Sequence, residues 1–216
     1  MFNSLGLIHF QYLLNGALWT IVLSIIAFSG GAVGGIVLAL LRISPYASLR
    51  IISRLYIQTI QGTPLLVILF LVFFGLPGIG ITTTPLTAAS IALIIYVSAY
   101  LGEIWRGCLE AVSKSQWEAA ECLAMSKLQR MVYIILPQAF RMAVPPTVGF
   151  LVQIIKNTSL TSIVGFVELT RAGQLINNSL FEPFLVYSLI AALYFLMCFP
   201  VSLLSRRLEV RTHKAA

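Results

Sequence analysis

Three stretches of this sequence contain no Asp, Glu, Lys or Arg, and they constrain the fold more than any other feature. They cover residues 1–41, 55–102 and 183–205, and a fourth stretch, 142–167, contains only Lys156. A helix needs about 20 apolar residues to cross the hydrocarbon core of a bilayer. Only 10% of the 216 residues are charged, whereas soluble domains carry about 25%. The sequence therefore predicts an all-α integral membrane protein.

The charge-free run 55–102 is too long for one helix, and the turn-forming segment 75–85, GLPGIGITTTP, divides it. The apolar stretches then predict five transmembrane helices, which we expect to form one domain over residues 1–216. These spans are expected at residues 17–41, 55–74, 86–103, 142–167 and 183–204. The three cysteines lie far apart without metal-ligand spacing, so we expect no metal site.

Basic residues gather on one side of the expected spans. The segments on that side contain Arg42, Arg50, Arg54, Arg106, Lys114, Lys127, Arg130, Arg141, Arg206, Arg207, Arg211 and Lys214. The segments on the other side, 1–16, 75–85 and 168–182, contain a single lysine or arginine, Arg171. The positive-inside rule places the N-terminus outside and the C-terminus in the cytoplasm. The net charge of +7 is thus a topology signal, and we expect no nucleic-acid partner.

One polar stretch, SQWEAAECLAMSKLQR at residues 115–130, interrupts this apolar chain on the cytoplasmic side. Ser115 with Glu118, and Ser126 with Gln129, fit two capping boxes, which predict two short helices that meet near residues 124–126. Pro137 is expected to end the second helix. An apolar stripe follows both helices at spacings of three and four, through Trp117, Ala120, Leu123, Ala124, Leu128 and Met131. Taken alone, this pattern also fits a helix lying on the membrane surface.

The longer string EAAECLAMSKLQRMVYIILP resembles the EAA signature of permease subunits of ATP-binding cassette (ABC) importers. The matching residues are Glu118, Ala119, Ala120, Ala124, Ile134, Leu136 and Pro137, with Ala124 at a position that is usually Gly. The segments 61–80, 98–120, 136–141 and 156–173 look like the polar amino acid uptake subfamily. Two departures weaken any inference about substrate: Gln61 stands where Arg is commoner, and Asn157 where Asp is commoner.

The resemblance implies a multi-pass permease of the bacterial cytoplasmic (inner) membrane that carries a polar amino acid. It implies that short coupling helices within a cytoplasmic loop at 115–137, between spans three and four, dock on a cytoplasmic ABC ATPase. A second permease subunit, identical or paralogous, and an external substrate-binding protein are the other expected partners. The chain has no P-loop motif, so ATP is expected on the partner ATPase, with no cofactor and no catalytic residue in this chain.

Several alternatives remain open from the sequence. One is an ABC permease for a different small solute, and only the segments that look like the amino acid subfamily argue against it. Another is an ATP-independent channel or secondary transporter, which would not need the cytoplasmic loop with its two capping boxes. An intramembrane enzyme lacks support, because His9 and His213 lie near opposite ends of the chain and no paired intramembrane carboxylates occur.

Four residues are candidates for contact with a zwitterionic substrate. Lys156 lies about 22 Å along its helix from Arg141, at ~1.5 Å per residue, and a cation at that depth usually faces a cavity or a partner. Together with Thr158 and Ser159 it is expected to bind the substrate carboxylate, with a structural role as the alternative. Glu168 is expected either to receive the ammonium group or to be a solvated acid at a helix end.

Two further groups of residues are given structural roles. Glu103 and Arg106 are three residues apart and are expected to form an ion pair. The overlapping G-x-x-x-G pairs of the first span, formed by Gly30, Gly31, Gly34 and Gly35, predict close helix packing.

Overall fold

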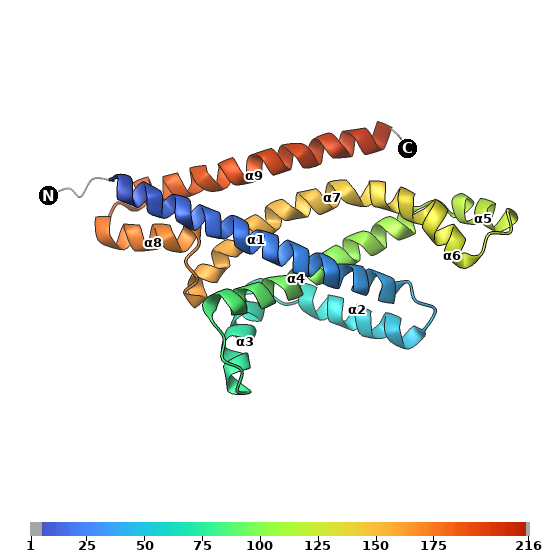
Figure 1. Cartoon of the computed structure of the whole chain (residues 1–216), viewed down its shortest axis with the longest axis horizontal. Coiled ribbons are helices and arrows are strands. Elements are labelled where there is room, and N and C mark those ends of the chain that lie inside the picture. Colours follow the sequence, from blue (N-terminus) through green and yellow to red (C-terminus); the bar gives the residue numbers. More distant parts are fainter. Residues whose placement is uncertain (1–5, 215–216) are drawn as a thin grey trace.

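The structure is a computed structural model that describes residues 6–214, and within this part it contains helices and turns but no strand (Figure 1). The side chains of His213 and Lys214, at the C-terminal end, lie outside the described part. The elements are α1 (Leu7–Arg42), α2 (Ala47–Gln61), α3 (Leu65–Gly78), α4 (Pro85–Ala111), α5 (Lys114–Cys122), α6 (Lys127–Gln129), a π-helical turn (Arg130–Ile135), α7 (Leu136–Asn157), a 3₁₀ helix (Thr158–Val164), α8 (Leu169–Leu180) and α9 (Pro183–Lys214). The all-α fold predicted from the sequence is confirmed.

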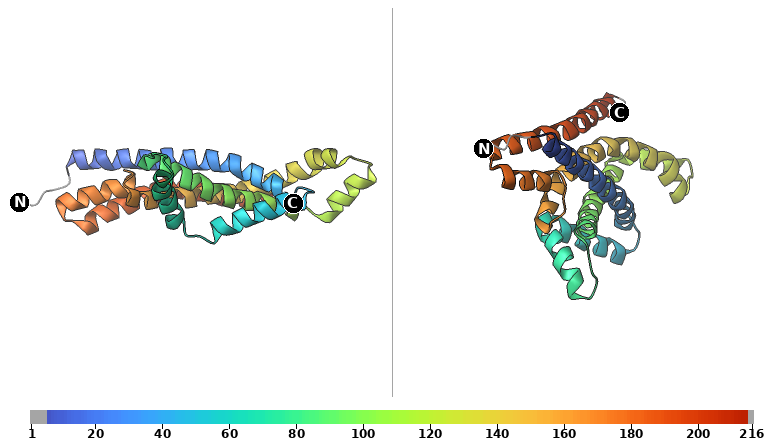
Figure 2. Two further views of the ribbon diagram at one scale, coloured as in Figure 1. Left: turned by 90° about the horizontal axis from the view of Figure 1, so that it is seen from below. Right: turned by 60° about the vertical axis from the view of Figure 1, so that its left-hand side comes forward.

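The long helices α1, α4, α7 and α9 run roughly along the long axis of the molecule (Figures 1 and 2). At one end lie α8 and the start of α1. At the other end lie α5, α6, the turn between α1 and α2, and the end of α9. This second end carries the basic residues found in the sequence, so the elongated fold separates a basic end from one with few cations.

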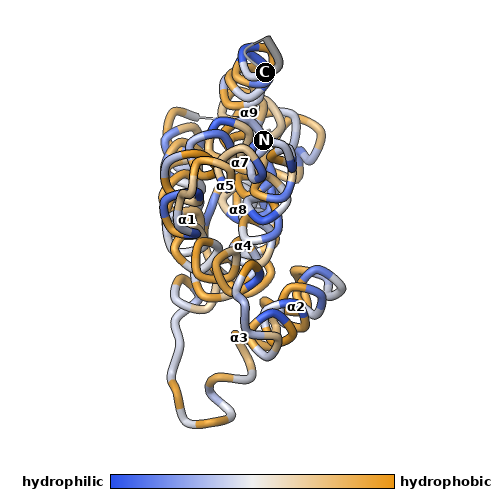
Figure 3. Tube along the Cα trace, turned by 90° about the vertical axis from the view of Figure 1, so that its right-hand side faces the viewer, coloured by the Kyte–Doolittle hydropathy of each residue, from blue (hydrophilic) through white to orange (hydrophobic). Residues whose placement is uncertain are grey.

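Three of the expected spans lie in single long helices, and a fourth, 142–167, lies in a continuous helical run except for its last three residues. α1, α4, the run Lys127–Val164 and α9 are each long and apolar enough to cross a membrane. Hydrophobic residues recur throughout the traced helices (Figure 3). Large apolar side chains that are more than half exposed, such as Ile25, Val33 and Phe195, suit lipid better than water.

The expected span at 55–74 is wrong as a single helix. α2 and α3 together are apolar enough to form one span, but they meet at a bend of 102°, and α3 leaves the other helices at a steep angle (Figures 1 and 2). Gly62 ends α2 and Pro64 precedes α3. Proline lacks an N–H and disfavours a helical conformation at the residue before it, so the helix breaks here. Residues 6–214 thus contain four helices that are long and apolar enough to cross a membrane, or five candidate spans if the bent pair counts as one.

Glycines allow α1 and α4 to pack at close range, as the G-x-x-x-G pattern predicted. A Cβ atom added at Gly31 would collide with Val97 and lie 3.2 Å from the backbone nitrogen of Ser98. At Gly35 it would lie 3.1 Å from the backbone nitrogen of Gly102. Backbone atoms cannot move aside as the end of a flexible side chain can. The pair α1–α4 therefore forms a tightly packed centre on which the other helices rest.

We expect Gly31→Ala to lower the stability of the protein by about 1–3 kcal/mol, the usual cost of overpacking a tight contact. Gly107→Ala is the matched control, because this glycine also lies in a long helix but an added Cβ meets nothing within 4 Å. The control should be neutral or stabilising by roughly 0.5–1 kcal/mol. Thermal unfolding of the detergent-solubilised chain measures both, and equal melting temperatures would contradict the close packing.

Candidate functional site

The polar stretch forms a hairpin of two short helices, α5 and α6, at the basic end of the molecule. The predicted cap at Ser126 is confirmed: its hydroxyl accepts the N–H of Gln129, and the Gln129 side chain accepts the N–H of Ser126 at 2.9 Å. The cap predicted at Ser115 is wrong, because α5 begins at Lys114 with Ser113 in the N-cap position, two residues earlier than that cap requires. Ser115 lies within the first turn and its hydroxyl bonds that of Ser113.

The turn between the two helices is a Schellman motif closed by Ala124. The N–H of Met125 donates to the carbonyl of Ala120, and the N–H of Ala124 donates to the carbonyl of Glu121. Ala124 has a φ of 54°, the left-handed region that favours glycine. This conformation explains why glycine is usual at this position of the signature, although the present chain has alanine there.

The apolar stripe of the hairpin divides into two faces. On one face Ala120 is only 2% exposed, and Trp117 and Met131 pack against the buried cluster that contains Leu109 and Ala139. On the other face Leu123 and Leu128 are 74% and 73% exposed. Glu118, Ala119 and Ala124 are also exposed. One face therefore anchors the hairpin, and the other is free to contact another surface.

The hairpin continues into α7 through a widened helical turn. A π-helical turn, Arg130–Ile135, leads directly into α7, so the expectation that Pro137 ends the helix is wrong. A proline ring normally clashes with the carbonyl four residues before it, and the wider π turn relieves this clash. Leu136 and Pro137 form the partly exposed first turn of α7. Arg130 also bonds Glu121 at 3.1 Å and ties the turn to α5.

Far along the same helical run lies Lys156, an exposed cation within an expected span. It makes no ion pair among residues 6–214. The expected partners do not share its surface: Thr158 is fully buried and its hydroxyl donates to the carbonyl of Ile155. The hydroxyl of Ser159 donates to the carbonyl of Lys156 at 2.7 Å. The three residues thus do not form one donor cluster, because the chain turns from α-helix to 3₁₀ helix at Thr158.

Two amide side chains beside Lys156 were not chosen as candidates from the sequence. Gln153 is exposed one turn before Lys156, and its amide donates to the side-chain oxygen of Asn157 at 3.1 Å. The amide nitrogen of Asn157 is buried and has no hydrogen-bond partner within the described chain. A buried amide that lacks a partner is costly. The signal in the sequence was an amide at residue 153, three residues before Lys156, which is the only cation of the expected span.

An aromatic group spans the contact between α4 and α7. Tyr100 and Phe150 stack with ring centroids 5.4 Å apart, and Tyr96 lies 4.5 Å from Tyr100. These rings belong to α4 and α7, which pack against each other, and α7 also carries Gln153 and Asn157. The three rings are half-buried. They were not predicted as site residues from the sequence, because aromatic residues in a span usually serve packing.

Glu168 is buried, so the alternative that it is a solvated acid at a helix end is wrong. It is fully buried and caps α8, accepting the N–H groups of Thr170 and Arg171 at 2.9 Å each. It also accepts the hydroxyls of Tyr194 in α9, at 2.8 Å, and Thr20 in α1, at 3.4 Å. All this hydrogen bonding comes from the chain itself, so Glu168 has a structural role here.

The predicted pair of Glu103 and Arg106 is confirmed and is part of a larger group. The Nε atom of Arg106 lies 3.0 Å from both carboxylate oxygens of Glu103. Arg106 also pairs with Glu110, and Arg42 lies 3.7 Å from Glu103. These contacts join the ends of α1 and α4 beside the hairpin.

Residues 31–214 match the family described as "Binding-protein-dependent transport system inner membrane component". The probable amino-acid ABC transporter permease protein YckA of Bacillus subtilis is 38% identical over 199 residues, which cover 92% of this chain and 88% of that protein. The glutamine transport system permease protein GlnP of Escherichia coli is 33% identical over 201 residues, or 92% of each.

Solved structures share the same fold. The crystal structure of an amino acid ABC transporter with histidines superposes with a TM-score of 0.90 at 32% identity, over 96% of this chain and 99% of that one. The MetNI methionine ABC transporter, at 18% identity, shares the fold with a TM-score of 0.74, over 94% of this chain and 99% of that one. The chain therefore belongs to the family of binding-protein-dependent transport system inner membrane components.

Proposed function

We propose that this chain is the transmembrane permease subunit of an ABC importer that brings a polar amino acid into the bacterial cytoplasm. The observation that carries the proposal is the hairpin of α5 and α6, whose sequence carries the EAA signature and whose outer face is apolar and uncovered. Relatives named as amino-acid and glutamine permeases support the substrate class.

The hairpin is proposed to receive force from the ATPase. Leu123, Leu128 and the exposed Glu118 offer a surface of mixed apolar and acidic character, while Ala120 and Trp117 hold the hairpin against the spans. Ala120 serves the inner contact, although the resemblance alone would place it with the docking residues. ATP would bind to the partner ATPase, and its closure would move the hairpin and α7 together.

The exposed stripe of α7 is proposed to line the substrate pathway between two permease subunits. An unpaired ammonium group in lipid is expensive, so Lys156 is expected to face water or a partner subunit. Lys156 is proposed to bind the substrate carboxylate, with Gln153 beside it as a second donor. Thr158 and Glu168 are left out of this site because both are buried and bonded within the chain.

The end that carries α8 is proposed to face outward and to receive the substrate-binding protein. It contains a cavity of about 450 Å³ lined mainly by His9, Gln11, Tyr12 and Asn15 of α1. The positive-inside rule supports this orientation, because the basic residues lie at the opposite end.

Replacing an exposed leucine of the hairpin by an acid, Leu128→Glu, is expected to weaken binding of the ATPase. Burying the leucine side chain is worth about 1.5–3 kcal/mol, so affinity should fall by ~10–150-fold. Co-purification of the ATPase and substrate-stimulated ATP hydrolysis measure this. Val210→Glu is the matched control, since Val210 is 56% exposed at the same end but lies outside the hairpin. Equal ATPase retention by both variants would exclude docking at this face.

The orientation predicts which residues an impermeant thiol reagent can reach in intact cells. In a chain without its native cysteines, a cysteine at exposed Asn178 should react, and one at exposed Lys127 should react only after permeabilisation. Removal of the native cysteines matters because Cys122 is exposed on the hairpin. The reverse pattern would mean that the hairpin faces outward and could not meet a cytoplasmic ATPase.

Lys156→Met is expected to impair uptake per assembled complex while leaving assembly with the ATPase intact. A hydrogen bond to a charged group contributes about 1.5–3 kcal/mol, so substrate should bind ~10–150-fold more weakly. Lys156→Arg should recover part of the uptake, because it keeps the charge with a different donor geometry. Normal uptake by Lys156→Met would rule out the carboxylate role, and loss of assembly would indicate a structural one.

A further inference from the structure

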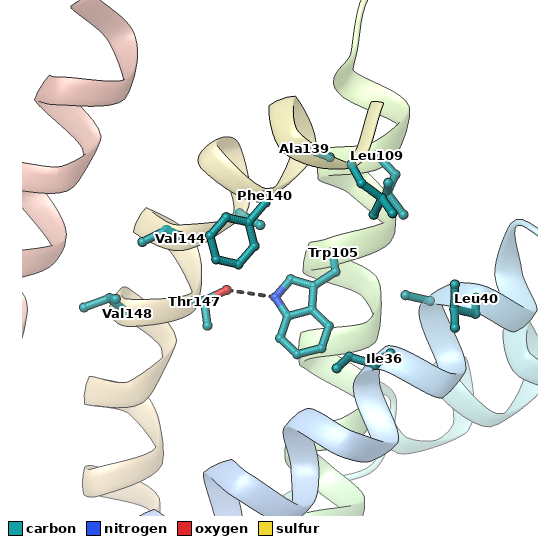
Figure 4. Close-up of a pocket in the computed structure, with 12 residues that line it drawn as sticks. Ile36, Leu40, Trp105, Leu109, Ala139, Phe140, Val144, Thr147 and Val148 are labelled. Atoms are coloured by element: carbon teal, nitrogen blue, oxygen red, sulfur yellow. Dashed lines mark hydrogen bonds between the residues drawn. The ribbon is translucent and has the colours of Figure 1, made fainter. Parts of the chain in front are cut away.

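A groove with apolar walls lies between α1, α4 and α7, near the basic end of the molecule (Figure 4). Its volume is about 430 Å³, within the range of roughly 300–1,000 Å³ typical of ligand sites. The only lining residues with polar side-chain atoms are Trp105 and Thr147, and the indole N–H of Trp105 donates to the Thr147 hydroxyl at 2.9 Å. The groove therefore offers hydrocarbon contact and no free polar group of its own to hold water.

Three arginines follow the lining residues closely in sequence. Arg42 comes two residues after Leu40, Arg106 directly after Trp105, and Arg141 directly after Phe140. Arg106 and Arg42 are engaged by acidic residues. Arg141 is exposed and forms no salt bridge with any residue between 6 and 214. Arg141 thus follows a lining residue, Phe140, directly in sequence and is an exposed cation without an ion pair among residues 6–214, at the end of the molecule where the basic residues gather.

We infer that this groove binds an acyl chain of an acidic phospholipid, whose anionic headgroup pairs with Arg141. The chemistry requires an occupant that is apolar along its length and negative at one end. Basic sites between transmembrane helices on the cytoplasmic side suit such headgroups. The assignment to the cytoplasmic leaflet rests on the proposed orientation, whereas the binding of lipid in the groove does not.

The position of the groove connects this lipid to the hairpin. Leu109 and Ala139 line the groove and also belong to the cluster in which Trp117 and Met131 pack. A bound acyl chain contacts the same two side chains that anchor α5 and the π turn. The lipid therefore supports the inner face of the hairpin, and its loss should loosen this anchor.

The test uses the complete importer in vesicles of phosphatidylcholine with phosphatidylglycerol, the latter carrying a photoreactive group in its acyl chain. After irradiation, labelled peptides are identified by mass spectrometry. We expect labelling to concentrate on the groove walls, around Ile36, Trp105 and Val144, above the level on the exposed surface of α9. Ala143→Trp, which fills the groove, should reduce it to the α9 level, whereas Ala191→Trp on α9 should not.

A second variant tests the headgroup without filling the groove. Arg141→Gln should reduce groove labelling by the phosphatidylglycerol probe but not by a phosphatidylcholine probe with the same reactive group. Arg206→Gln removes an exposed arginine of α9 and should change neither. Groove labelling no higher than on α9, or equal sensitivity of both probes to Arg141→Gln, would overturn the proposal. So would disulfide cross-linking that places a second permease subunit against Val144→Cys. None of these readouts depends on substrate transport.

Discussion

The close contact of α1 with α4 is the constraint on which the other helices depend. In a bilayer no water drives helices together, and tight packing through small residues takes over that role. Gly31 and Gly35 let α1 meet the backbone of α4 directly. α4 then also packs against α2, α3 and α7. Because α4 is surrounded in this way, its side chains Ala92, Val97 and Leu101 are fully buried, whereas most of α9 is open to its surroundings.

Glu168 fixes the other end of the molecule by a different interaction. A carboxylate taken out of water needs hydrogen bonds in compensation, and this one receives them from α8, from Thr20 in α1 and from Tyr194 in α9. The sequence identified Glu168 as unusual but predicted solvent or substrate around it. One of its hydrogen-bond donors, Thr20, lies 148 positions earlier in the sequence. No local sequence pattern indicates such a contact.

The sequence predicted those features that depend on local chemistry. Charge-free length predicted the spans, small-residue spacing predicted the α1–α4 contact, and the Ser126 cap predicted the start of α6. Predictions failed where neighbouring turns compete. Ser115 does not cap α5, because the helix begins earlier in the chain. Pro137 does not end its helix, because the preceding π-helical turn accommodates the proline ring. The bend at Pro64 was not predicted, because the hydrophobic run continues through it and composition alone indicates one span.

The site residues were harder to predict because residues adjacent in sequence diverge in space. Lys156, Thr158 and Ser159 look like one polar cluster, yet the change from α-helix to 3₁₀ helix separates exposed Lys156 from buried Thr158. What the sequence could not reveal is that Lys156 and the hairpin belong to one continuous helical run. From Lys127 to Val164 the chain has 38 helical residues, about 57 Å at ~1.5 Å per residue.

This continuity gives the proposed coupling a physical form. Helical backbone between the hairpin and Lys156 contains no loop that could absorb a displacement, and Pro145 and Pro146 lie inside α7 without interrupting it. Under the proposed function, a push of the ATPase on Leu128 would be carried along the helical run to the exposed residues Gln153 and Lys156. The only irregular part of this path is the π turn Arg130–Ile135, where Arg130 is held to Glu121. That ion pair holds the hairpin to the turn, so in the proposed coupling a movement of the hairpin would displace α7 with it.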